Sequence, residues 1–329
     1  MRVLVTGGGG FLGSAICKSL AARKDQVISY SRGRHSHLQS FQVQHIQGDI
    51  TDRRSLKKAA EGCDAVIHTA AKAGVWGSYQ SFYRPNVVGT QNVISVCRDL
   101  SIRKLVVTSS PSVVFDGKDM EGVDETAPYP ALWHAPYPAT KAQAEKAALA
   151  ANDAYLAVTV LRPHLIWGPG DPHLVKRIVE RGKSGKLKRI GTADKHIDSI
   201  YIDNAADAHV LALDRLEPGS PCAGKVYFIS NGEPVETWWL INAILKAHNV
   251  SPVNKTMPVP LAFAAAGVME MIWKSFRIRS EPLLTRFVVK ELTTSHWFDI
   301  SAAERDLGYR PLVTLAEGLR RLSVSSEVI

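Results

Sequence analysis

Short apolar runs alternate with amphipathic stretches through the first half of this chain. The apolar runs are rich in Val and Ile and have the length of buried strands. They cover residues 3–6, 27–31, 43–47, 65–69, 105–109 and 157–162. Helix-period patterns lie between them, at 12–22, 53–60, 87–99 and 139–151. Strands that alternate with helices through right-handed crossovers form a parallel sheet covered on both faces, so the pattern predicts a doubly wound α/β fold.

The regular alternation ends after residue 162. Prolines and glycines interrupt the chain between 163 and 172, and later prolines punctuate helical stretches. A run at 226–230 predicts a strand that returns to the sheet. We therefore expect a sheet domain and a smaller, mostly helical C-terminal lobe. The first comprises residues 1–165 with 192–232, and the second comprises residues 166–191 with 233–329.

A glycine loop follows the first strand directly. Gly7, Gly10 and Gly13 stand between an apolar strand and an amphipathic run that starts at Ser14. The first glycine permits a tight turn, the second lets backbone amides approach a pyrophosphate, and the third lets helix and strand pack closely. The helix N-terminus adds partial positive charge toward the anion. The loop predicts a Rossmann domain that binds a dinucleotide, with the ligand outside the carboxyl ends of the strands.

The end of the second strand indicates which nicotinamide nucleotide is preferred. An acidic residue there accepts hydrogen bonds from the adenosine ribose and repels a 2′-phosphate. This chain has Ser31 at that place, followed by Arg32 and Arg34. Guanidinium groups without a carboxylate favour phosphate, so we expect NADP(H) as the preferred cofactor and NAD(H) as second choice. Asp49, after the third strand, is a candidate for contact with the adenine amino group.

A tyrosine and a lysine lie four residues apart at the start of an alanine-rich stretch. The spacing of Tyr137 and Lys141 places both side chains on one helix face. A phenol is a poor acid at neutral pH, and a neighbouring ammonium group lowers its pKa toward a useful range. We therefore expect Tyr137 to act as the acid–base group, with Lys141 as its tuning partner.

Hydroxyl groups at the end of the fifth strand support this interpretation. Ser110 is our first choice for holding a substrate carbonyl oxygen, and Ser112 is the fallback. Asn86, ahead of a predicted helix, either orients Lys141 or simply caps that helix. The glycine loop, serine, tyrosine and lysine follow one another in the order that the strand ends require.

Composition and charge narrow the partners. The 329 residues carry a formal net charge of +9, but the basic residues form no compact motif with aromatic ones. We therefore expect an anionic cofactor and an acidic substrate rather than nucleic acid. The basic stretch from Lys176 to Arg189 is interpreted as solvated surface. The eleven histidines show no metal-ligand spacing, and we expect no metal.

Four dispersed cysteines are typical of reduced thiols in a cytoplasmic protein, and no apolar run is long enough to span a membrane. No signal peptide is expected ahead of the first strand. The apolar run from Leu261 to Trp273 is followed by Lys274, Arg277 and Arg279, and two structural interpretations of this segment are open. It is either a buried or substrate-covering helix, or an interfacial helix that makes peripheral membrane contact.

At this point the chain resembles the extended short-chain dehydrogenase/reductase family along essentially its full length. The segments from Thr108 to Phe115 and from Arg162 to Pro172 are similar to signatures of the 3β-hydroxysteroid dehydrogenase branch. The segments at 71–79, 86–90 and 228–234 resemble the bacterial 2-alkyl-3-oxoalkanoate reductases of long-chain olefin biosynthesis. Sterol-decarboxylating relatives often carry an aspartate at the end of the second strand, and Ser31 departs from that pattern.

The resemblance implies NADPH-dependent reduction of a long-chain β-keto acid to the 3-hydroxy acid. A sterol dehydrogenase and a sugar-nucleotide epimerase or dehydratase on the same fold are the alternatives, and a non-catalytic NADP-binding regulator is a third. We expect a homodimer that can join a multi-enzyme assembly. The catalytic candidates are Ser110, Tyr137, Lys141 and Asn86. The expected cofactor contacts are Gly7, Gly10, Phe11, Leu12, Gly13, Ser31, Arg32, Arg34, Asp49, Ile50, Ala70, Ala71, Tyr137, Lys141 and Pro163.

Overall fold

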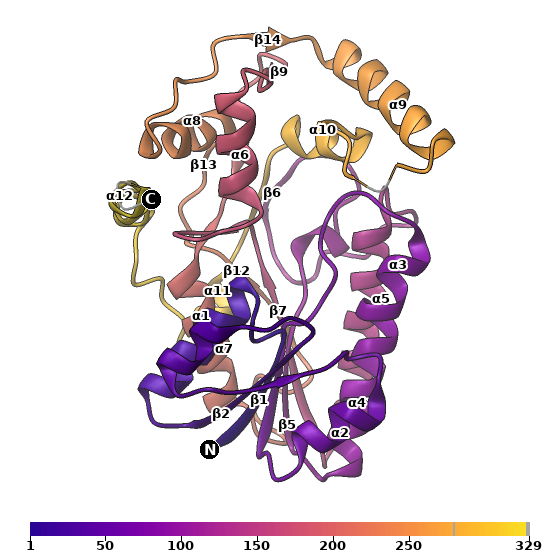
Figure 1. The fold of residues 1–329 in the computed structure, drawn as a ribbon, viewed down its shortest axis with the longest axis vertical. Helices are drawn as coiled ribbons and strands as arrows, with labels where there is room; N and C mark the ends of the chain where they lie inside the picture. The colour runs from indigo at the N-terminus through magenta and orange to yellow at the C-terminus, as the bar shows by residue number, and fades with distance from the viewer. Residues whose placement is uncertain (279, 327–329) are drawn as a thin grey trace.

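A seven-stranded parallel sheet forms the centre of the protein (Figure 1). The computed structural model describes residues 1–278 and 280–326. The strand order is β12-β7-β5-β4-β1-β2-β3, so the winding direction reverses between β1 and β4. Ligands of such sheets bind outside this point, at the carboxyl ends of the strands. The strands are β1 (Arg2–Thr6), β2 (Gln26–Ser31), β3 (Gln44–Gln47), β4 (Ala65–His68), β5 (Lys104–Thr108), β7 (Ala157–Pro163) and β12 (Val226–Ile229).

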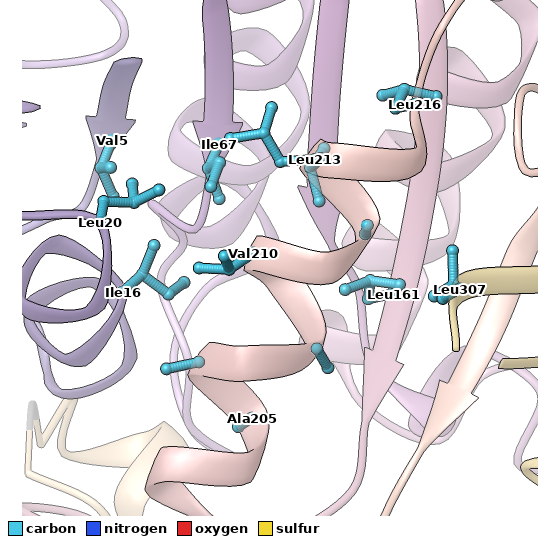
Figure 2. Packing of buried hydrophobic residues seen from close by; sticks show 14 of the residues in the cluster. Val5, Ile16, Leu20, Ile67, Leu161, Ala205, Val210, Leu213, Leu216 and Leu307 are labelled. Carbon is cyan, nitrogen blue, oxygen red and sulfur yellow. The ribbon is translucent and has the colours of Figure 1, made fainter. Parts of the chain in front are cut away.

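Helices cover both faces of this sheet, which explains why its inner strands are apolar along their whole length. Every residue of β4 and of β7 is buried. On one face, α1 (Phe11–Ala22) and α7 (Ile202–Arg215) lie against each other. Figure 2 shows Ile16 and Leu20 of α1 and Val210 of α7 packed toward the sheet.

The opposite face is covered by the helices that carry the predicted catalytic residues. Their apolar sides form a second core cluster with strands β1, β2, β4, β5 and β7. A short π-helical turn, η2 (Arg84–Val88), leads directly into α4. The elements on this side are α2 (Arg53–Ala60), α3 (Tyr79–Tyr83), η2, α4 (Gly89–Asp99) and α5 (Pro136–Ala150), while the 3₁₀ turns η1 (Ser36–Phe41) and η3 (Pro111–Val113) follow β2 and β5.

The C-terminal lobe sits across the carboxyl edge of the sheet, at the top of Figure 1. Its helices share a third core cluster built around Trp167, Trp238 and Leu245. They are α6 (Leu174–Lys183), α8 (Thr237–Ala247), α9 (Val259–Ser275), α10 (Arg286–Leu292) and α12 (Leu315–Ser326). Short strands complete it: β6 (Met120–Val123), β8 (Ile166–Trp167), β9 (Arg189–Ile190), β10 (His196–Ile197), β11 (Ile200–Tyr201), β13 (Val235–Glu236), β14 (Thr256–Met257) and β15 (His296–Phe298).

The predicted fold class is confirmed, and the predicted strands agree with the observed ones within one or two residues. The predicted division into a sheet domain and a C-terminal lobe stays a prediction. One segment assigned to the lobe packs against the sheet domain. Helix α11 (Ser301–Leu307) contacts α7 and β12, and Ile300, Leu307 and Tyr309 lie in the core under the sheet. In the described part of the chain, no helix combines the length and apolar character needed to cross a membrane.

Candidate active site

The glycine loop lies between β1 and α1, at the carboxyl edge of the sheet. Gly7 has a φ of +74°, a conformation that other residues rarely adopt. A Cβ on Gly13 would lie 2.1 Å from the Gly7 carbonyl oxygen, so only glycine lets α1 approach the loop this closely. No side chain caps the N-terminus of α1 within the described chain, and its first amides remain available to an anion. The loop therefore has the geometry of a phosphate cradle.

A cleft of about 490 Å³ runs from this loop along the ends of β2, β3, β4 and β5 to the catalytic candidates. Two predicted cofactor contacts do not line it. Arg34 is exposed outside the cleft, and Pro163 lines a neighbouring cavity at the end of β7. The predicted contacts that do line the cleft are Gly7, Gly10, Phe11, Leu12, Gly13, Ser31, Arg32, Asp49, Ile50, Ala70, Ala71, Tyr137 and Lys141.

His35 takes the place beside Arg32 that the sequence analysis gave to Arg34. Its ring lies over the glycine loop, because a Cβ on Gly9 would come within 2.0 Å of the ring. Burial, with His45 and His37 nearby, lowers the pKa of His35. The sequence offered one signal for this residue, an imidazole three positions beyond Arg32 in a segment without acids, and the analysis missed it.

Unpartnered hydroxyl groups show that the cleft suits a polar ligand. The Ser31 and Ser109 Oγ atoms are buried and have no hydrogen-bond partner among the described residues, and both residues line the cleft. Asp49 uses one carboxylate oxygen, Oδ1, to accept hydrogen bonds from the Thr51 amide and hydroxyl, at 2.8 and 2.9 Å. The glycine cradle, the orphan hydroxyls and the Arg32 guanidinium fit a nicotinamide dinucleotide.

Tyr137 lies in the first turn of α5, which begins at Pro136 rather than at residue 139 as predicted. Proline suits this first position because its fixed φ is helical. Its missing amide hydrogen costs no hydrogen bond within the helix, because an amide at this position has no helical partner. Burial raises the pKa of the Tyr137 phenol, and a hydrogen bond with Ser110 opposes that rise. The Ser110 and Ser112 hydroxyls are 2.9 Å apart, so both predicted carbonyl-binding candidates lie in one hydrogen-bonded group.

Lys141 lies one turn further along α5 and points to the end of β5. Its Nζ donates to the Thr108 carbonyl oxygen at 2.5 Å. Burial lowers the pKa of Lys141 to about 8, against the opposing effect of Glu145. The sequence analysis expected Lys141 to lower the pKa of Tyr137, whereas in the structure Ser110 supplies the lowering contribution.

Asn86 has side-chain contacts beyond those of a helix cap, and they reach the residue before Lys141 rather than Lys141 itself. It is buried inside the π-helical turn, where Oδ1 accepts from the Lys72 amide at 2.7 Å. Its Nδ2 donates to Thr140 Oγ1 at 3.1 Å. Asn86 therefore joins the loop after β4 to the helix turn that carries Tyr137, and acts as a positioning residue.

A second cavity, of about 520 Å³, adjoins the cleft beneath the C-terminal lobe. Ser110, Ser112 and Tyr137 line it at the sheet end, with apolar side chains such as Phe115 and Phe287 around them. The residues that line both the cleft and the cavity are Ala73, Tyr137 and His173. Tyr137 is thus placed where a cofactor in the cleft and a substrate in the cavity meet.

A buried chain of polar groups supports the cavity wall. Asp198 lies 2.5 Å from His164 Nδ1, His164 Nε2 lies 3.2 Å from His296 Nδ1, and His296 Nε2 lies 2.9 Å from the Glu291 carbonyl oxygen. A carbonyl only accepts, so His296 Nε2 carries a hydrogen. Burial and His164 lower the pKa of His296 to about 4, so the neutral ring accepts from His164. A short contact between His164 Nδ1 and Asp198 Oδ1 completes the row of buried polar groups.

These buried polar contacts and most charged residues of the cavity were not predicted from the sequence. Arg177, which the sequence analysis assigned to solvated surface, lines the cavity together with Glu281 and Glu291. These residues come from α6, from the segment before α10 and from α10, and no local motif connects them. Among the described residues, no group of three or more His, Cys, Asp or Glu side chains is arranged to hold a metal ion.

The chain is similar to known proteins over most of its length. The model of the 3-beta hydroxysteroid dehydrogenase/isomerase family matches residues 4–261. A 2-alkyl-3-oxoalkanoate reductase from Stenotrophomonas maltophilia is 48% identical over 328 residues, which cover 99% of both chains. A decarboxylating sterol-4-alpha-carboxylate 3-dehydrogenase from Mus musculus is 33% identical over 97% of this chain and 89% of that protein.

Among solved structures, a UDP-glucuronic acid 4-epimerase from Bacillus cereus in complex with NAD has the same fold. The TM-score is 0.77 at 23% identity, with 100% of this chain and 99% of the epimerase covered. This likeness supports the architecture and carries no information on the substrate.

Proposed function

This chain belongs to the 3-beta hydroxysteroid dehydrogenase/isomerase family, and we propose that it reduces long-chain 2-alkyl-3-oxoalkanoates to the 3-hydroxy acids. The observation that carries the proposal is the position of Tyr137, which lines both the dinucleotide cleft and the largely apolar cavity. A ketone in the cavity is thereby adjacent to a proton donor and to a cofactor at once. The near-complete coverage of the Stenotrophomonas reductase supports the substrate class.

The cofactor is a nicotinamide nucleotide, which supplies hydride when it is bound in the cleft. The glycine loop between Gly7 and Gly13 would hold its pyrophosphate. We propose NADP(H) over NAD(H), because Arg32 and His35 lie at the end of β2 and residues 31–35 contain no carboxylate. The Arg32 guanidinium matches the charge of a 2′-phosphate, and the neutral His35 imidazole can donate a hydrogen bond to it.

The chain's own residues handle the proton. As the ketone carbon becomes tetrahedral, its oxygen gains negative charge, and the Ser110 hydroxyl is placed to hold that oxygen. The Tyr137 phenol gives its proton to the oxygen, which completes the alcohol. The phenolate that remains is stabilised by a hydrogen bond from Ser110, the group that already opposes the rise of the Tyr137 pKa.

Turnover with matched substrates tests this function. β-Keto acids lose carbon dioxide readily, so the reverse direction is the cleaner assay: long-chain 2-alkyl-3-hydroxy acids with NADP⁺ or NAD⁺. We expect oxidation of these acids with NADP⁺, and slower or no turnover of UDP-glucose. A sterol bearing a 4-carboxylate next to its 3-hydroxyl is the informative third substrate, because a relative with that activity covers this chain. Turnover of UDP-sugars with no activity on any β-hydroxy or β-keto acid would refute the proposal.

A further inference from the structure

The cavity contains one strong cation that the proton-transfer residues do not use. Arg177 of α6 is the only arginine or lysine among the described residues that line the cavity. Ser110, Tyr137 and the apolar side chains account for a ketone and for alkyl chains, but they offer no partner to a negative charge. An anionic group in this cavity therefore has one strong cationic partner, the Arg177 guanidinium.

Arg177 is held by a carboxylate that stands at the same wall. Its Nη2 lies 2.6 Å from Glu281 Oε2, and Glu281 Oε1 accepts a hydrogen bond from the Val75 amide at 3.2 Å. The Arg177 and Glu281 side chains are 35% and 32% exposed. Ion pairs with this exposure contribute little to stability, so exchange of Glu281 for another carboxylate costs little. Glu281 thus marks a carboxylate position on the cavity wall.

Glu291, the second acid among the described residues that line the cavity, carries less than a full negative charge near neutral pH. Its carboxyl group has no hydrogen-bond partner among the described residues, and it lies within electrostatic range of both Tyr137 and Arg177. Burial raises the pKa of Glu291 to about 7, against the opposing effect of Arg177. At neutral pH about half of these carboxyl groups are therefore protonated, and a protonated carboxyl group can donate a hydrogen bond to an anion.

We propose that Arg177 binds the carboxylate of the substrate, in the position that Glu281 marks. The inference rests on the proposed function and deepens it. In a 2-alkyl-3-oxoalkanoate the carboxylate is attached to the carbon next to the ketone, so its partner must line the same cavity as Tyr137, as Arg177 does. A guanidinium binds a carboxylate through two parallel hydrogen bonds and thereby also fixes the ketone's orientation.

The test compares a charged substrate with its uncharged analogue. A long-chain 2-alkyl-3-hydroxy acid and its methyl ester are oxidised by the full chain with NADP⁺. For Arg177→Met we expect kcat/KM for the acid to fall roughly 10- to 100-fold, mainly through KM, and kcat/KM for the ester to stay within about twofold. Arg177→Lys keeps the positive charge but cannot form two parallel hydrogen bonds, so its kcat/KM for the acid should lie between those of Arg177→Met and the wild type.

Two controls separate anchoring from structure. Lys176→Met removes the same charge from the neighbouring position on α6, where the side chain is 62% exposed, and should leave both substrates unaffected. Glu281→Gln weakens the competing ion pair and should lower KM for the acid or leave it unchanged. An equal loss on acid and ester in Arg177→Met would make Arg177 merely structural and overturn the inference. No activity of the wild type on either substrate would instead refute the proposed function.

Discussion

The two halves of the active site are built in different ways. The cofactor cleft is lined by short consecutive segments, at 7–13, 31–35, 48–50 and 69–73, each at the end of a parallel strand. The substrate cavity combines short segments at strand ends, such as 110–112 and 163–165, with single side chains of the lobe, such as Arg177, Glu291 and His296. In the cleft, the sheet topology brings the strand ends together, so short motifs in the sequence identify the lining. In the cavity, the charged side chains are brought together only by the packing of the lobe.

The largest effect is expected at Tyr137, where the two halves meet. Tyr137→Phe keeps the ring and its packing but removes the proton donor, so turnover should fall about 10²- to 10⁴-fold. Cofactor affinity should change little, because the phosphate cradle lies elsewhere. Steady-state kinetics and calorimetric titration of NADPH measure the two quantities. A variant that keeps more than about a tenth of wild-type turnover would place the acid on another residue.

The same contrast decides what the sequence could predict. Periodicity located the strands of the parallel sheet, and the glycine loop, Ser31-Arg32 and Tyr137-Lys141 were readable because each motif is continuous in the chain. Arg177 was predicted to lie on the solvated surface, because its partner, Glu281, is 104 positions away in the sequence and no local pattern connects the two. Charge in a helical stretch usually means solvent, and only the tertiary packing turns this side chain into a cavity wall.

Acid should destabilise the sheet core and the cavity wall through buried neutral histidines. Burial lowers the pKa of His68 to about 3 and that of His209 to about 4, and burial with His164 does the same for His296. Below pH 6.5 these histidines bind protons in the unfolded chain but stay neutral in the folded chain. Each histidine therefore reduces the free energy of unfolding by up to about 1.4 kcal/mol for each pH unit that the pH falls. Glu291, whose raised pKa is about 7, opposes the trend between pH 7 and 4.5.

Urea denaturation at pH 7, 6 and 5 measures this dependence. We expect the free energy of unfolding to fall at each step, and His296→Gln to make the fall shallower. His68 and His209 lie at the sheet, whereas His296 lies in the cavity wall, so the variant isolates the contribution of the cavity wall to the pH dependence. Stability that is constant over this range would contradict the buried neutral state of all three rings.

A smaller effect is expected at the end of β2. NADPH should bind at least about tenfold more tightly than NADH, a difference of about 1.4 kcal/mol. Arg32→Asp removes the phosphate partner and supplies an acceptor for ribose hydroxyls, so it should reverse the preference. Calorimetry with both nucleotides measures it, with exposed Arg34→Asp as the matched control. Equal affinities of the wild type for the two nucleotides would remove the basis for assigning Arg32 to the phosphate.

The smallest effect concerns α9, at the outer edge of the lobe (Figure 1). Its inner side is buried at Ala262 and Ala266, while Val268 and Met271 are 51% and 61% exposed and Lys274 follows in its last turn. If this side meets a membrane, Met271→Ser should weaken co-sedimentation with phosphatidylglycerol vesicles about two- to fivefold. Leu312→Ser, at a 78% exposed site elsewhere, is the control. An equal effect of both changes, or no sedimentation of the wild type, would favour the substrate-covering reading of this helix.

The shared wall of Ala73, Tyr137 and His173 has a thermodynamic consequence. These residues line the cleft and the cavity together, so a ligand that orders them on one side prepares them for a ligand on the other. Such coupling is reciprocal: any factor by which the nucleotide tightens substrate binding is the factor by which substrate tightens nucleotide binding. The same three side chains therefore take part in both binding equilibria, and a change at any of them should alter the affinity for both ligands.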